Sequence, residues 1–276
     1  MQTVRIFSTA QGGTKVEDLP LPFVAIDPPM DARIFRRLAA GEEIPRTTAP
    51  LMPARGMQAV RSMEKQTRYW NPDRGRYLVF VISGEIAVST TAGNGRSLVP
   101  GDVLLIDTAE VEDGMLQRLG DCRLLQLRLA DDWVARGALP DAELDRAGDP
   151  QRRPNLKRMY KSGDDKSYFR AFDQLFPEAS GRPGAARPVR GFWFVRFEPG
   201  AFIDWHPEVV NNFVIVLSGA LELEVSGDGS IEVFSAGDVC LAEDRTGEGH
   251  IDRMHDINRL ALLEFEDEDL WDSAGE

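Results

Sequence analysis

The chain has few cysteines and lacks a long apolar run. Its two cysteines, Cys122 and Cys240, lie in different halves within apolar segments, which is typical of buried free thiols and not of a disulfide framework. No apolar run approaches the roughly 20 residues needed to span a bilayer. Residues 1–12 lack the basic and apolar regions of a signal peptide. We therefore expect a cytoplasmic protein.

The chain also lacks a net positive charge. Its formal net charge is -13 at pH 7 and its isoelectric point is about 4.8. Such a surface repels phosphate backbones and anionic lipids, so we expect neither nucleic acid nor a membrane as a partner. A content of 42% hydrophobic and 28% charged residues is typical of a globular protein. A length of 276 residues is enough for two domains, each with its own core.

Histidine is scarce as well, and its distribution is uneven. The three histidines, His206, His250 and His255, all lie in the second half of the chain. Because neutral imidazole is the commonest metal ligand in proteins, this gathering predicts a shared site. His206 and Glu208 are two positions apart, so on a strand their side chains point to the same side. The apolar, β-branched segment 213–217 behind them predicts a buried strand.

The pattern around His206 occurs twice in the chain. Trp-Asn-Pro-Asp at 70–73 matches Trp-His-Pro-Glu at 205–208, and the flanking segments 53–84 and 188–219 share 11 identities in 32 positions without a gap. With one inserted residue the match continues, so that Gly-Asp-Val at 101–103 corresponds to Gly-Asp-Val at 237–239. A repeat of this length indicates two copies of one domain instead of a solenoid.

Both copies read as a series of short strands separated by glycine turns. Short helices are predicted at 31–40 and within 131–144, and the polar segment 145–154 is predicted to be a linker. We therefore divide the chain into domains 1–145 and 146–276, each an all-β sandwich or barrel. The strands expected in the second half are 191–198, 212–217, 220–225, 230–234, 239–242 and 259–265.

The residues around His206 resemble the first sequence motif of the cupins, which are small β-barrels of jelly-roll type. That motif has a glycine, five residues, His-x-His, a glutamate and a closing glycine. The corresponding residues here are Gly200, His206, Glu208, Asn212 and Gly219. Glutamate thus stands at the second histidine position and asparagine at the glutamate position. The resemblance implies a cupin fold more specifically than it implies a chemistry.

The second cupin motif is matched from Gly237 to His250. His250 ends the sequence Gly-Glu-Gly-His and comes two residues later than the standard spacing would place it. The second half is similar to a subgroup of single-domain bacterial cupins with this Gly-x-Gly-His ending. Together with the internal repeat, the resemblance implies an all-β protein of two tandem cupin domains, a bicupin.

A complete cupin metal site uses three histidines and one glutamate. The matching positions imply one divalent metal ion in the second domain, with Fe(II) expected first and Mn, Ni or Zn as alternatives. Two imidazoles and a carboxylate form the set that holds non-haem Fe(II). The first domain has no histidine at the same positions, so we expect no metal there. The implied ligands are His206, Glu208, His250 and Asn212, and the corresponding first-domain residues are Asn71, Asp73, Tyr77 and Gly114.

The candidate substrate-binding residues are Trp193, Trp205, Asn212 and His255. Two alternatives stay open at this point. The tryptophans also suit a packing role in the core, because alternating residues of one strand cannot all face a pocket. On a strand that starts at His250, the side chain of His255 would point to the opposite face from that of His250. A surface role for His255 is therefore equally consistent with its position.

Two functions from different classes are consistent with these residues. In the first, the chain is a metal-dependent enzyme that acts on a small molecule, and the resemblance implies dioxygenases, isomerases and decarboxylases as candidates. In the second, it is a metal-free small-molecule-binding or sensor protein in which the incomplete motif marks lost catalysis. The resemblance also implies that the chain can form a homodimer.

Overall fold

The computed structural model describes residues 1–9, 11–26, 51–62, 66–68, 75–90, 93, 95–107, 114–131, 133, 148–177 and 184–265. Within these ranges the regular structure is β-strand apart from one short 3-10 turn, η1 (Asp173–Leu175), which confirms the all-β prediction. The helix predicted at 31–40 lies outside the described residues, as does all but residues 131 and 133 of the segment 131–144. Among the described residues there is no helix with the length and apolarity needed to cross a bilayer.

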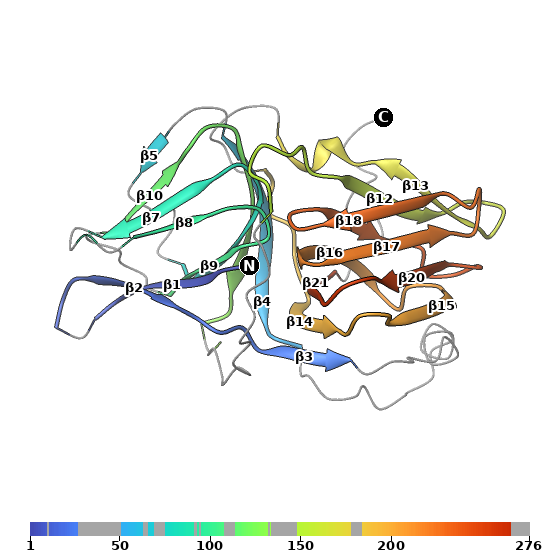
Figure 1. Ribbon diagram of the computed structural model, residues 1–276, viewed down its shortest axis with the longest axis horizontal. Helices are drawn as coiled ribbons and strands as arrows, with labels where there is room; N and C mark the ends of the chain where they lie inside the picture. The colour runs from blue at the N-terminus through green and yellow to red at the C-terminus, as the bar shows by residue number, and fades with distance from the viewer. Residues whose placement is uncertain are drawn as a thin grey trace. The chain divides into compact units, whose positions relative to one another are not determined.

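The first compact unit contains two sheets (Figure 1). The larger has six strands in the order β2-β1-β9-β6-β11-β4, and the smaller has four in the order β5-β10-β7-β8. Strand β6 is buried along its whole length because it lies in the middle of the larger sheet. The strands are β1 (Thr3–Ser8), β2 (Thr14–Asp18), β4 (Ala54–Ser62), β5 (Gln66–Arg68), β6 (Tyr77–Ser83), β7 (Ile86–Thr90), β8 (Gly95–Leu98), β9 (Val103–Ile106), β10 (Gly114–Arg118) and β11 (Cys122–Leu129).

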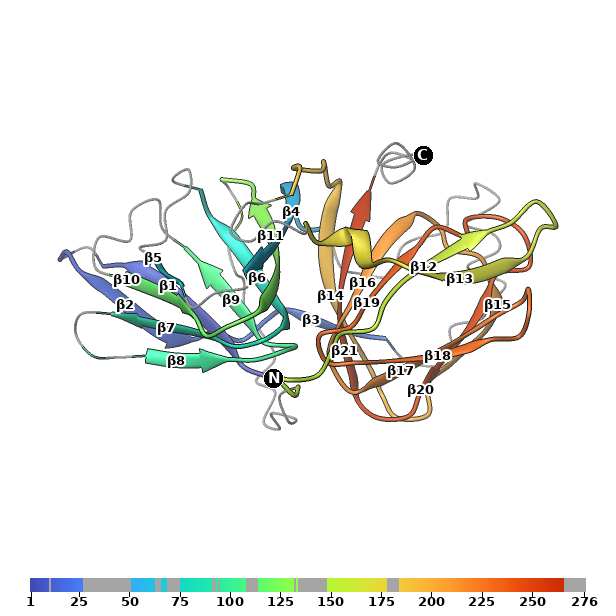
Figure 2. The same ribbon diagram turned by 90° about the horizontal axis from the view of Figure 1, so that it is seen from above.

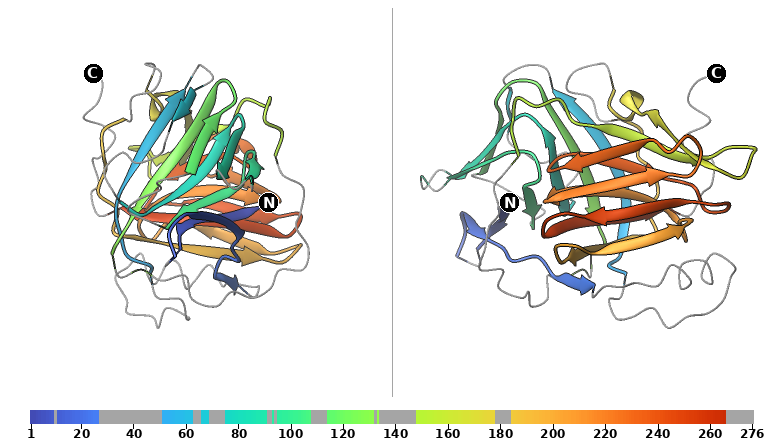
Figure 3. Two further views of the ribbon diagram at one scale, coloured as in Figure 1. Left: turned by 90° about the vertical axis from the view of Figure 1, so that its left-hand side faces the viewer. Right: turned by 45° about the vertical axis from the view of Figure 1, so that its right-hand side comes forward.

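The second unit also contains two sheets (Figure 2). The larger has the order β13-β12-β19-β16-β21-β14-β3 and the smaller the order β15-β20-β17-β18, whose strands run side by side in the right-hand view of Figure 3. The strands are β3 (Phe23–Ile26), β12 (Leu156–Lys161), β13 (Ser167–Ala171), β14 (Gly191–Phe197), β15 (Phe202–His206), β16 (Asn211–Ser218), β17 (Ala220–Val225), β18 (Ile231–Ser235), β19 (Val239–Ala242), β20 (His250–Met254) and β21 (Asn258–Phe265).

The strand orders of the two units correspond one to one. If β3 is set aside, the larger sheet of the second unit repeats the order of the first with every strand replaced by its later copy. The smaller sheets correspond in the same way. The duplication read from the sequence is therefore a duplication of topology.

The two units do not separate at a single point in the chain, as the division into 1–145 and 146–276 supposed. Strand β3 pairs in parallel with β14, so an N-terminal segment belongs to the second unit. In the other direction, the backbone N–H of Gly184 donates to the carbonyl of Ala59 at 2.8 Å, and the segment around it is grouped with the first unit. Backbone pairing, which a composition change does not reveal, decides both assignments.

The repeated Gly-Asp-Val segment has a structural role in both units. In the second, the fully buried Asp238 accepts hydrogen bonds from the backbone N–H groups of Asn155 at 2.6 Å and Ser235 at 2.7 Å. In the first, Asp102 accepts in the same way from Gln2 and Val99. Each carboxylate therefore joins the residue before one strand, β1 in the first unit and β12 in the second, to a turn. This role accounts for the aspartate in both copies without a catalytic function.

The interior of the second unit is lined by apolar side chains that alternate along its strands. Val214 and Val216 of β16 pack in one cluster with Leu223 of β17 and Cys240 of β19. Cys122 and Cys240 are both buried and neither forms a disulfide, which confirms the prediction of buried thiols. Polar residues of the same unit gather where β15 and β20 meet.

Candidate metal centre

The register of two antiparallel strands brings His206 and His250 together. His206 is the last residue of β15, His250 is the first of β20, and the two are direct partners across the pair. Their ring centroids are 4.4 Å apart, and both residues are buried. The fold therefore brings these two histidines to one place, although they are far apart in sequence.

A glycine makes this approach possible. Gly249 has φ +78°, in the left-handed region that side chains disfavour. A methyl group at this position would overlap the backbone carbonyl of His206. The second glycine of Gly-x-Gly-His is therefore required both by the turn and by the closeness of the two histidine-bearing strands.

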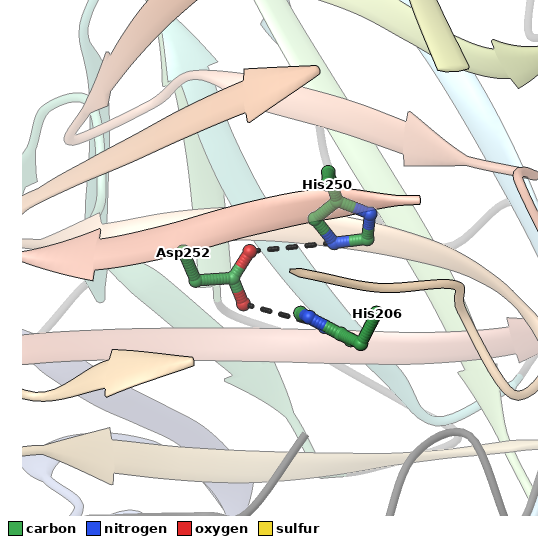
Figure 4. Close-up of side chains that lie close together, drawn as sticks. All are labelled: His206, His250 and Asp252. Atoms are coloured by element: carbon green, nitrogen blue, oxygen red, sulfur yellow. Dashed lines mark ion pairs between the residues drawn. The ribbon is translucent and has the colours of Figure 1, made fainter. Parts of the chain in front are cut away.

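Asp252 joins the two histidines. It follows His250 by two residues on β20, so both side chains point to the same face of the strand. Its carboxylate lies 3.3 Å from Nε2 of His250 and 4.0 Å from Nε2 of His206 (Figure 4). One ligand atom from each of the three residues lies within 4.8 Å of the other two.

The other ring nitrogen of each histidine, Nδ1, makes a hydrogen bond to an oxygen of the protein. Nδ1 of His250 donates to Asp244 at 2.8 Å, and Ser167 Oγ donates to the same carboxylate oxygen at 2.7 Å. Nδ1 of His206 donates to the carbonyl oxygen of Asp204 at 2.9 Å. Since oxygens of these kinds can only accept, both Nδ1 atoms carry the proton. In the neutral rings the lone pair is then on Nε2, on the side of Asp252, which is the tautomer that a metal ligand requires.

Glu208 and Asn212 lie beside this group. Glu208 is largely buried, and its Oε1 is 4.0 Å from Nε2 of His250. Its Oε2 accepts a hydrogen bond of 3.0 Å from Nδ2 of Asn212 on β16. Of the four ligands implied by the cupin motif, His206 and His250 meet in one group, Glu208 lies beside His250, and Asn212 contacts Glu208.

Burial and the neighbouring charges shift the pKa values of the side chains in this group. Burial alone lowers the pKa of His250, but the carboxylates of Asp244 and Asp252 outweigh it and raise that pKa well above its ordinary value. Burial, followed by repulsion from His250, lowers the pKa of His206. Burial raises the pKa of Glu208 to about 7. Burial also raises the pKa of Asp252, but His250 outweighs that effect and the net shift is downward.

The remaining sequence-predicted residues lie outside the group. His255 is exposed after β20, with Nε2 3.0 Å from Glu222, so the alternative of a surface role is the one that the structure supports. Trp193 packs against the apolar cluster inside the second unit, and its buried Nε1 has no hydrogen-bond partner among the described residues. Trp205 precedes His206 on β15 and is partly buried.

Sequence reasoning missed Asp252, Asp244 and Ser167. Asp252 carried a usable signal, because it stands two positions after His250 and therefore shares its side of the strand. Asp244 and Ser167 carried none, since they are 77 positions apart and meet only through the fold.

The first unit has no counterpart of this group in the part of the chain that the structure describes. Tyr77 is buried at the start of β6, and Gly114 begins β10. Asn71 and Asp73 lie outside the described residues.

The group of His206, His250 and Asp252, with Glu208 beside His250, fits a divalent metal ion. Two imidazoles and two carboxylates are the donors that Fe(II), Mn(II) and Zn(II) take in proteins. A buried atom is consistent with this fit, because Oδ1 of Asp252 forms an ion pair with Nε2 of His250 at 3.3 Å but no well-aligned hydrogen bond among the described residues. A metal ion would satisfy that oxygen and would separate the charges that now lie against one another.

No family model matches the chain, and no curated protein matches it either. Among solved structures, a cupin 2 conserved barrel domain protein from Leptotrichia buccalis is 13% identical over 80% of this chain and 92% of its own, with a TM-score of 0.35. A protein of unknown function from Pseudomonas syringae pv. tomato is 12% identical over 95% of this chain and 100% of its own, with a TM-score of 0.38. Oxalate decarboxylase of Lactobacillus farciminis, in a formate complex, is 12% identical over 77% of this chain and 78% of its own, with a TM-score of 0.29. The likeness concerns the fold alone.

Proposed function

We propose that the second unit is a metal-dependent enzyme that acts on a small molecule, with Fe(II) as the metal and oxygenase chemistry of the dioxygenase type. The observation that carries the proposal is the meeting of His206, His250 and Asp252 within 4.8 Å. Two histidines and a carboxylate form the set used by non-haem Fe(II) oxygenases, which leaves coordination positions open.

The chain's own residues have distinct tasks in this proposal. His206, His250 and Asp252 hold the ion, and Glu208 adds a second carboxylate beside His250. Asp244 keeps the Nδ1 proton of His250 in place, so that Nε2 remains the binding atom. When bound, the metal would supply Lewis acidity and oxygen activation.

Metal content tests the proposal directly. We expect protein purified without added metal, or titrated with Fe(II) under anaerobic conditions, to bind about one ion per chain. His206→Ala should lose that ion, because it removes a buried ligand. The matched control is His255→Ala, which removes a histidine of the same unit that pairs with Glu222 and should leave metal content unchanged. An equal loss in both variants would contradict the assignment.

The reaction class has a separate test. Reconstitution with Fe(II) should give a protein that consumes oxygen in the presence of its substrate, whereas stoichiometric zinc in the purified protein would exclude oxygenase chemistry in favour of a Lewis-acid reaction.

A metal-free binding or sensor protein is the second candidate, and one observation favours it. His250 already lies between Asp244 and Asp252, at 2.8 and 3.3 Å, so ion pairing can satisfy the ring without a metal. A site that stays empty when titrated with Fe(II), Mn(II) and Zn(II) would support this candidate over the enzyme.

We propose the cytoplasm as the location, because Cys122 and Cys240 are thiols outside any disulfide, which suits a reducing compartment. A homodimer is the assembly that the cupin resemblance implies. Light scattering of the purified protein would decide between a dimer and a monomer.

A further inference from the structure

Exposed apolar side chains gather on one face of one sheet. Within the described part of the chain, the exposed large apolar residues are Leu119 in the first unit and Phe202, Ile231 and Val233 in the second. Phe202 begins β15 and the other two are on β18, so they occupy the two outer strands of the smaller sheet of the second unit. Their sequence neighbours Ile203 and Phe234 pack in the core of the unit. Since side chains alternate along a strand, all three exposed residues point outward.

Charged side chains lie between these apolar edges on the same outer face. The strand register places four residues in one row across the sheet, in the order Phe202, Arg253, Glu222 and Val233. Arg253 forms ion pairs with Glu222 at 3.0 Å and with Glu224 at 2.5 Å, and His255 pairs with Glu222 at 3.0 Å. Asp204 adds an exposed carboxylate on β15 outside the row. From β15 to β18 the row is therefore apolar, cationic, anionic and apolar.

The order of residues in this row is self-complementary about a twofold axis. When two copies pack these faces together around an axis that runs parallel to the strands between β20 and β17, β15 of one copy lies over β18 of the other. Phe202 then faces Val233 of the second copy, and Arg253 faces its Glu222. Apolar surface is removed from water at both edges, and opposite charges meet in the middle. The same contacts occur twice, as an isologous interface requires.

The first unit has the same sheet without this pattern. The register of β5, β10, β7 and β8 forms the corresponding row, Thr67, Gln117, Ala87 and Ser97. Inward positions of the two sheets keep apolar residues in both copies, as Leu98 and Phe234 illustrate. The row of the first unit, in contrast, contains neither a charged nor a large apolar residue. The fold therefore does not require the apolar edges and the central ion pair, which are specific to the second unit.

We propose that two copies of this chain associate through the outer face of the smaller sheet of the second unit, around a twofold axis parallel to its strands. The cupin resemblance implies a homodimer without indicating a surface, whereas this inference names the surface and is independent of the metal site. The face covers about 300 Å² per copy, from four strands about 4.8 Å apart and five residues that rise about 3.3 Å each. Interfaces below about 1,200 Å² in total are weak and transient, so the dimer should form in the micromolar range and dissociate on dilution.

Charge reversal on two separate chains tests the predicted contacts. In Arg253→Glu the new carboxylate would face Glu222 of the second copy, and in Glu222→Arg the new guanidinium would face Arg253. Each variant alone should therefore dimerise at least tenfold more weakly than the wild type. An equimolar mixture of the two variants has opposite charges at every predicted contact and should form a heterodimer. Sedimentation equilibrium of the full chain measures the masses, and thermal unfolding shows that each variant is folded.

The apolar edge has its own test and a matched control. Val233→Asp places a charge opposite Phe202 of the second copy and should weaken the dimer at least tenfold. Leu119→Asp makes the same kind of change at an exposed apolar residue of the first unit and should leave the dimer unchanged.

Three results would overturn the inference. The first is a wild-type protein that stays monomeric throughout the micromolar range, which would leave this face for a different partner. The second is a dimer that survives Val233→Asp, because another surface would then hold it. The third is a mixture of folded Arg253→Glu and Glu222→Arg chains that does not associate. None of these measurements involves metal, so they leave the proposed function to its own test.

Discussion

Replacing Asp244 by asparagine leaves the size of the side chain nearly unchanged but removes a buried charge behind His250. Asp244 has no exposed surface and accepts from His250 Nδ1 at 2.8 Å and Ser167 Oγ at 2.7 Å through one oxygen. An amide oxygen in the same place could still accept both bonds but carries no net charge, so the pull on the Nδ1 proton weakens and His250 becomes a poorer ligand. Loss of such a partner lowers metal affinity about 10- to 100-fold, which is about 1.4–2.8 kcal/mol of binding free energy.

Two comparisons make the measurement specific. Ser167→Ala removes one hydrogen bond to Asp244 and leaves the contact with His250, so its effect on metal affinity should be smaller than that of Asp244→Asn. Asp228→Asn removes an exposed carboxylate that contacts Ser230 and should have no effect.

Calorimetric titration of each variant with Mn(II) provides the affinities, and thermal unfolding provides the stability of the same samples. If Asp244→Asn binds Mn(II) as tightly as the wild type, Asp244 does not orient His250. If its affinity falls only as much as its stability, the effect is structural, and the assigned positioning role is refuted.

Three further predictions follow from the same geometry. In urea unfolding, Gly249→Ala should destabilise the second unit by about 2 kcal/mol or more, since a left-handed φ costs about 1–3 kcal/mol and a methyl group would overlap His206. Gly229→Ala is the control and should cost less, because φ there is +68° but the space around it is open. Asp238→Ala should cost up to about 2–6 kcal/mol, because two partly buried backbone N–H groups lose their acceptor at about 1–3 kcal/mol each. A loss below about 1 kcal/mol in urea unfolding would contradict this role. The pKa of Glu208, raised from 4.5 to about 7, means that metal-free protein loses stability as the pH rises from 4.5 through 7. Glu208→Gln should remove that pH dependence in unfolding experiments, and an unchanged dependence would show that another group causes it.

Much of the architecture could be predicted because its signals are local. Alternating and β-branched segments marked the strands, and for β17 and β19 the predicted bounds agree with the structure. The repeat fixed the number of units in advance, since identical residues recur at turns such as Gly84 and Gly219, where φ is positive in both copies. Strands β15 and β20 were not among those predicted, because their apolar pattern is weak and polar site residues occupy their ends.

By itself the sequence determined the all-β class, the duplication, and the placing of every histidine in the second half. It also singled out His206 and Glu208 as candidates, because a two-residue spacing on a strand decides which side chains share a face. His250 became a candidate through the scarcity of histidine and the resemblance to the second cupin motif. Tertiary structure alone decided that Asp252 lies between the histidines, that Asp244 and Ser167 stand behind His250, and that His255 lies outside. It also decided that β3 joins the second unit. The alternation of side chains along a strand depends only on neighbouring residues, so the sequence predicts it. Strand pairing joins residues that are far apart in the chain, so a local sequence pattern does not predict which strands pair.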